Sequence, residues 1–71
     1  MMRNPERLDI FYDTIKRMHK ESFPDWRFGQ LFYNFWYWLA NEKDMDIFFP
    51  EEYEMMKLFE EYVNGAKTDN A

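Results

Sequence analysis

The sequence predicts an all-α domain of three helices with an aromatic helix at its centre. Three segments place apolar residues at helical spacing, and none shows the alternation that is typical of a strand. Pro5, Pro24 and Pro50 lie close to the expected starts of these segments. A chain of 71 residues is long enough for one domain, which we place at 1–65, followed by a disordered tail at 66–71.

The first helix is expected over residues 5–21. Asn4 suits the N-cap position, and Pro5 suits the first position of the helix because its missing N–H needs no partner there. On the charged side of this helix, Asp13 and Arg17 are four residues apart with the acid nearer the N-terminus, and we expect them to form an ion pair. The apolar side holds Leu8, Phe11, Tyr12, Ile15, Met18 and His19.

The second helix is expected over residues 26–41, after Pro24 ends the first and Asp25 caps the second. It carries no charge from Phe28 to Asn41. The arc expected to face the core holds Phe28, Leu31, Phe32, Phe35, Trp36, Trp38 and Leu39. The opposite arc holds glycine, alanine, amides and phenols, a mixture that favours a contact surface over open water.

The third helix is expected to open at Pro50 with Glu51 and Glu52, because acids are favoured at the positive end of the helix dipole. Gly65 indicates its C-cap. Its apolar side holds Met55, Met56, Leu58, Phe59, Tyr62 and Val63.

Composition restricts how such a small domain is stabilised. The chain has no Cys and a single His, which excludes disulfides and thiolate metal sites. Aromatic residues make up 23% of it, and each buried ring covers about 150–250 Å². We therefore expect large aromatic core residues and self-association, as a homodimer, to stabilise the domain.

The net charge of −5 is concentrated in the second half of the chain. Residues 1–27 hold six basic and five acidic groups, whereas residues 42–63 hold two basic and eight acidic groups. Acidic surfaces repel phosphates, so nucleic acid is not an expected partner. The same acids raise an alternative function, in which the C-terminal half mimics nucleic acid and regulates a basic protein.

No membrane span or secretory signal is expected. The charge-free run from Phe28 to Asn41 is shorter than the roughly 17–25 residues that cross a bilayer. The N-terminal residues MMRNPERLDI contain no uninterrupted apolar region. We therefore expect a cytoplasmic protein.

No enzymatic activity, cofactor or metal is expected. His19 shares the apolar arc of the first helix, which favours a hydrogen-bonded residue at the edge of the core over a general base. The connector acids lack the glycine and the ligand spacing of a calcium loop, which favours solvated or capping roles. They are Glu42, Asp44, Asp46, Glu51 and Glu52.

The expected functional surface lies on the uncharged arc of the second helix. Tyr33 and Tyr37 are four residues apart, and tyrosine suits interfaces because it joins an apolar ring to a polar tip. Burial of both rings inside the same chain is the alternative. The expected interface residues are Gly29, Gln30, Tyr33, Asn34 and Tyr37, with Trp36 at the border.

The segment Pro24-Asp25-Trp26-Arg27-Phe28-Gly29-Gln30-Leu31 resembles the Pro-Asp-x-Arg-x-Gly-Gln-Leu signature of a family of short bacterial and prophage proteins. Arg3-Asn4-Pro5-Glu6-Arg7 and Asp46-Ile47-Phe48-Phe49 are similar to further elements of that family. The resemblance implies a compact helical fold and no assigned reaction. Within the signature, Arg27 is expected to pair with Asp25 or an acid of the third helix, and Gly29 to allow close backbone approach.

Overall fold

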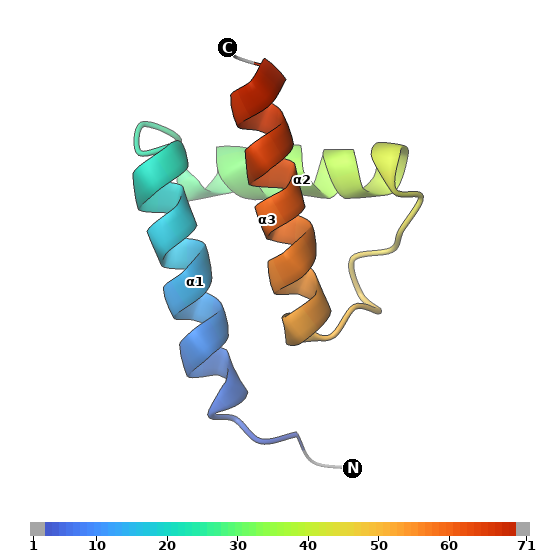
Figure 1. Ribbon diagram of the computed structural model, residues 1–71. Coiled ribbons are helices and arrows are strands. Elements are labelled where there is room, and N and C mark those ends of the chain that lie inside the picture. Colours follow the sequence, from blue (N-terminus) through green and yellow to red (C-terminus); the bar gives the residue numbers. More distant parts are fainter. Residues whose placement is uncertain (1–2, 70–71) are drawn as a thin grey trace.

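The computed structural model describes residues 3–69, with side chains described through residue 66. Three helices follow in order: α1 over Arg7–Ser22, α2 over Phe28–Glu42 and α3 over Glu52–Asp69 (Figure 1). No strand occurs within the described range. The predicted all-α, three-helix architecture is therefore confirmed.

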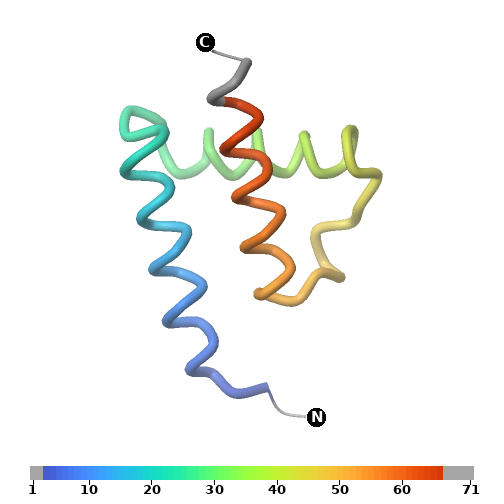
Figure 2. The backbone as a smooth tube through the Cα atoms, in the orientation of Figure 1, coloured from blue at the N-terminus to red at the C-terminus, as the bar shows by residue number. Residues whose placement is uncertain are grey.

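The helices form two layers. α1 and α3 lie side by side with the same chain direction, and α2 starts beside the C-terminal end of α1 and crosses behind α3 (Figure 2). The shortest dimension is 19 Å, about the thickness of two helices with their side chains. Only one side of α2 can therefore be covered by the rest of the chain.

α1 begins two residues later than expected. The Oδ1 atom of Asn4 accepts a hydrogen bond from the N–H of Glu6 at 3.0 Å, and Arg7 N–H donates to the Asn4 carbonyl at 3.2 Å. Asn4 and Pro5 therefore form a turn that leads into the helix. Tyr12, expected on the apolar side, is exposed, as is Ile10.

The link from α1 to α2 is held by stacked rings and not by a side-chain cap. The rings of Phe23 and Trp26 stack with centroids 4.2 Å apart, and Trp26 N–H donates to the Phe23 carbonyl at 3.1 Å. This turn keeps Trp26 and Arg27 out of the helix. The expectation that Asp25 caps α2 is wrong: Arg27 occupies the N-cap position without a side-chain cap bond.

The core lies where α2 crosses α3. Leu31 and Leu39 are almost completely buried, and Trp38 packs at the edge. Expected core residues Phe28, Phe32 and Trp36 are instead exposed, since α1 and α3 cover only one side of α2. The buried apolar residues are Met18, Phe23, Leu31, Phe35, Leu39, Phe59, Tyr62 and Val63.

Tyr62 is the hub of the aromatic core. Its ring lies 5.8 Å from that of Phe35, 5.5 Å from that of Trp38 and 6.2 Å from that of Phe23, centroid to centroid. These spacings fall within the range of favourable edge and offset contacts. Burial raises the pKa of the Tyr62 phenol because it disfavours the phenolate. One side chain of α3 thus joins α2 to the loop that follows α1.

The segment after α2 contains a residue with left-handed backbone geometry, two positions beyond the end of the helix. Asp44 has φ of 53°, and the N–H of Met45 turns back to the Leu39 carbonyl at 3.2 Å. Asparagine and aspartate tolerate this geometry better than most residues with a Cβ atom. The segment after α2 is thereby directed along the side of the helix.

α3 continues to Asp69, so the expected helix end at Gly65 is wrong. Gly65 has no positive φ and lies within the helix. Residues 70–71 of the expected tail lie outside the described residues. The domain boundary at residue 65 stays a prediction.

Two arginines join the start of α1 to the start of α3. Arg3 donates two hydrogen bonds to the Glu51 carboxylate, at 2.8 and 2.7 Å, and Arg7 Nε donates to Glu52 at 2.6 Å. The Arg3 guanidinium lowers the pKa of Glu51, and the Arg7 guanidinium lowers that of Glu52. These pairs hold the two parallel helices together at the end farthest from the aromatic core.

The charged side of α1 pairs differently from the expectation. Lys16 lies 3.8 Å from Asp13, and Arg17 lies 3.9 Å from Glu21 in place of the expected Asp13 partner. Both contacts are exposed and long, so each adds at most a few tenths of a kcal/mol to the free energy of unfolding. An i,i+4 pair of this kind contributes about 0.3–0.5 kcal/mol.

Replacing Leu39 with alanine should destabilise the domain by about 2–5 kcal/mol, because Leu39 is fully buried between α2 and α3. Urea unfolding followed by circular dichroism measures this free energy. Glu42→Ala, an exposed change on the same helix and outside the uncharged side, should alter stability by less than about 0.5 kcal/mol. Equal losses for the two variants would contradict the placement of Leu39.

Replacing Asp44 with valine should cost about 1–2 kcal/mol, since a β-branched residue is strained at positive φ. Asp44→Gly, which removes the Cβ atom, should match or exceed the wild type. The midpoint temperatures of thermal unfolding of the wild type and the two variants test whether residue 44 has left-handed backbone geometry. A valine variant as stable as the glycine variant would show that this residue is not left-handed.

Acid should weaken the α1–α3 pairing. The folded-state pKa of Glu51 and Glu52 lies below the ordinary value of 4.5, so their pairs stabilise the fold above that value and are lost as pH falls through the lowered pKa. Thermal unfolding of the wild type and of Glu51→Gln/Glu52→Gln from about pH 7 to about pH 3 measures the effect. The double variant should melt lower at neutral pH, and the difference should shrink in acid. A constant difference would contradict this role.

Candidate functional site

The uncharged side of α2 is open to solvent, as the sequence predicts. We call the six predicted residues, Gly29, Gln30, Tyr33, Asn34, Trp36 and Tyr37, the outer face. Five of them are exposed and Asn34 is half-buried. The intrachain alternative for Tyr33 and Tyr37 is therefore not the arrangement that the structure adopts.

The rings of the outer face form one continuous patch. The ring of Tyr33 lies 6.0 Å from that of Trp36 and 6.3 Å from that of Tyr37. Within the described residues, neither phenol oxygen has a hydrogen-bond partner. The patch therefore presents apolar ring surface with polar groups free to pair, the combination that is enriched in binding hot spots.

Gly29 leaves additional room on this face. A Cβ atom at Gly29 would meet nothing within 4 Å, so the expected close approach of a backbone does not occur among the described residues.

Arg27, just before α2, was expected to pair with Asp25 or an acid of α3. It forms no ion pair among the described residues.

Phe28 and Phe32 extend the aromatic surface along one flank. Their rings stack with centroids 5.9 Å apart while both remain exposed. At about 100° per residue, Phe32 points well away from Leu31, and Phe28 sits at the first residue of the helix where little covers it. Together, Phe28, Phe32, Tyr33, Trp36 and Tyr37 are each between 42% and 69% exposed.

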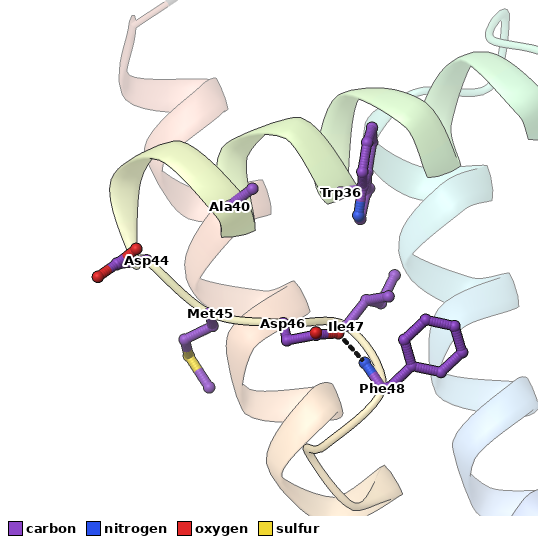
Figure 3. Close-up of a pocket in the computed structure, with 7 residues that line it drawn as sticks. All are labelled: Trp36, Ala40, Asp44, Met45, Asp46, Ile47 and Phe48. Atoms are coloured by element: carbon purple, nitrogen blue, oxygen red, sulfur yellow. Dashed lines mark hydrogen bonds between the residues drawn. The ribbon is translucent and has the colours of Figure 1, made fainter.

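A groove runs beside the outer face, between α2 and the segment that follows it. Trp36 and Ala40 form its α2 wall, and Trp36 points towards Ile47 on the other wall (Figure 3). Its volume is about 490 Å³. We call it the α2–loop groove; its residues are Trp36, Ala40, Asp44, Met45, Asp46, Ile47 and Phe48.

At the end of the groove lie the two most exposed large apolar residues of the described range. Phe48 is 88% exposed and Phe49 is 81% exposed. The Asp46 carboxylate accepts a hydrogen bond from the Phe48 N–H at 2.9 Å (Figure 3), and Phe49 N–H donates to the Asp46 carbonyl at 3.4 Å. Sequence reasoning missed these rings as site residues. Two adjacent phenylalanines before Pro50 were the available signal, because a short connector cannot bury both.

His19 has a structural role. Its Nε2–H donates to the Trp26 carbonyl at 2.8 Å, in a half-buried position between α1 and the turn before α2. This bond supports the interpretation of His19 as a hydrogen-bonded residue at the edge of the core. It also fixes the turn from which α2 departs.

The connector acids do not converge on one point. Glu51 and Glu52 bind arginines of the N-terminal segment, and Asp46 binds a backbone N–H. Among the described residues, no three His, Asp or Glu side chains lie close enough to hold a metal ion. In the same range, no helix has both the length and the apolar content to cross a membrane.

Part of the acidic C-terminal half is neutralised within the chain. Besides the two arginine pairs, Lys43 binds Glu61 and lies 5.7 Å above the ring of Trp38. Among the residues that the structure describes, three of the eight acids of residues 42–63 therefore have basic partners.

Comparisons of the chain with protein-family models, with curated proteins and with solved structures found no match. The resemblance of the segment from Pro24 to Leu31 to a bacterial and prophage family therefore stays a prediction. The site that this structure offers for functional interpretation is the outer face of α2 with the adjoining groove.

Proposed function

We propose that this chain is a non-enzymatic protein-interaction module that binds through the outer face of α2 and forms a symmetric homodimer. The observation that carries the proposal is the exposure of five aromatic side chains on the uncharged run of α2 from Phe28 to Asn41. The proposed bacterial or phage setting rests on the resemblance of the segment from Pro24 to Leu31, and the proposed cytoplasmic location rests on the sequence expectation of no secretory signal or membrane span.

The size of the patch supports a binding role. If each ring has about 200 Å² of accessible surface, the five rings of α2 expose roughly 540 Å². The largest apolar patch of a typical monomer is about 300–600 Å² and is often functional. The aromatic surface of this small domain thus lies near the upper end of what a monomer leaves open.

The absence of charge favours a second copy as the occupant. Two chains with a net charge of −5 repel each other over most of their surfaces, but α2 carries no charge between Phe28 and Asn41. Two outer faces can meet there without burying an ion. A two-fold dimer uses the same patch on both copies, which suits a face of rings and amides that both donate and accept hydrogen bonds.

The alternative function, an acidic regulator that mimics nucleic acid, has less support from the structure. Glu51, Glu52 and Glu61 are bound by Arg3, Arg7 and Lys43. An acid that is already paired contributes less to the attraction of a basic protein.

Changing Tyr33 and Tyr37 to alanine should weaken self-association by at least about tenfold, because both rings lie at the centre of the proposed interface. Helical circular dichroism should be largely preserved, since both rings are exposed. Sedimentation across protein concentration measures the association. Tyr12→Ala/Tyr53→Ala is the matched control, because it removes two exposed tyrosines from α1 and α3. An unchanged mass with a loss of helicity would show that Tyr33 and Tyr37 are core residues instead.

Salt separates the two candidate functions. Association through the outer face should change little between about 0.05 and 0.5 M NaCl, since no charge pairs across it. Binding of a basic protein such as lysozyme through the acidic half should collapse over the same range. Tight, salt-sensitive binding of lysozyme together with a monomeric chain would favour the acidic regulator.

A further inference from the structure

We infer that the homodimer interface extends beyond α2, and that Phe48 of each copy docks into the α2–loop groove of the other. This inference rests on the proposed function and names the second contact of the same dimer. The occupant of each groove is the aromatic segment that forms the edge of the other copy's groove.

Interface area is the first argument. A stable interface of ordinary size buries about 800 Å² per partner. The rings of α2 supply roughly 540 Å², and not all of them face the same direction. Adding Phe48 and Phe49 at the same area per ring raises the exposed aromatic surface to roughly 900 Å². The aromatic surface of α2 alone is therefore smaller than this area, whereas with Phe48 and Phe49 it is about as large.

Symmetry is the second argument. In a two-fold dimer, the same patch lies on both sides of the interface, so a projecting group and the cavity that receives it must share that patch. The projecting ring of Phe48 lines the groove, whose opposite wall is Trp36 and Ala40. The patch thus holds both a projecting ring and the groove proposed to receive it, and Trp36 belongs to both the groove and the outer face.

The chemistry of the walls fits an aromatic ring. Apolar side chains of Trp36, Ala40, Met45 and Ile47 form most of the lining, and no basic residue contributes. Asp44 and Asp46 lie in the same segment and are exposed, so they can keep their contact with water. Because the groove is open along its length, it cannot enclose most of a small molecule, as ligand pockets do.

The segment from Met45 to Phe48 is held in place by bonds within its own chain, before any contact with a second copy forms. Met45 is tied to Leu39 by a backbone hydrogen bond, and the Asp46 carboxylate holds the Phe48 N–H. Pro50 then fixes the backbone before α3 begins. A preorganised ring loses less conformational entropy on docking than a ring on a mobile loop.

Mixed cross-linking tests the pairing. Because the natural chain has no cysteine, single-cysteine variants react at one known position. Differently tagged Ala40→Cys and Phe49→Cys chains, mixed and treated with a short bismaleimide, should give several-fold more mixed dimer than Ala40→Cys with Tyr12→Cys. Both variants keep the Phe48 ring. Equal yields for the two mixtures would overturn the inference.

Sedimentation of Phe48→Ser provides the second readout. Loss of the docking ring should weaken association by at least about tenfold, whereas Tyr53→Ser should have little effect. If the wild type dimerises and Phe48→Ser dimerises equally well, the groove pairing is wrong but the interface of the outer face stands. If the wild type is monomeric at every concentration, both proposals fail.

Discussion

The crossing of α2 over α3 determines the rest of this structure. Phe35 of α2 packs against Phe59 and Tyr62 of α3. The centroid of its ring lies 5.0 Å from that of Phe59 and 5.8 Å from that of Tyr62. Since the molecule is only two helices thick, this contact covers one side of α2 and leaves the other side uncovered. The same contact that stabilises the domain therefore also exposes its aromatic surface.

Contacts at the periphery support this crossing. His19 fixes the turn before α2, and Lys43 joins the end of α2 to Glu61 of α3. Arg3 and Arg7 hold the far end of the helix pair through Glu51 and Glu52. Polar contacts thus set the entry and exit of α2, while aromatic and aliphatic side chains together form the buried core.

Much of the fold could be predicted because helical periodicity is local. The spacing of Leu31, Phe35 and Leu39 is sufficient to place them in the core, and the uncharged opposite arc is sufficient to place Tyr33 and Tyr37 outside it. These assignments depend only on which side of the helix a residue occupies.

Where the structure differs from the sequence predictions, the cause is tertiary geometry. Phe28, Phe32 and Trp36 are apolar enough for a core, but their burial requires a third layer that this chain does not supply. Asp25 has the chemistry of a cap, yet the Phe23–Trp26 stack delays the helix past it. Helical periodicity could not predict that Phe48 and Phe49 contribute to the site, because their contribution depends on where a non-helical segment lies relative to α2.

The shared direction of α1 and α3 has a consequence for how the chain reaches this structure. Neighbouring helices that run the same way cannot form as a hairpin, and Arg3 and Glu51 are 48 residues apart in the chain. Closing a segment of that length costs about 2 kcal/mol more loop entropy than closing a five-residue turn. Non-local pairing of this kind slows folding, so α2 and α3 should associate first and α1 should join last.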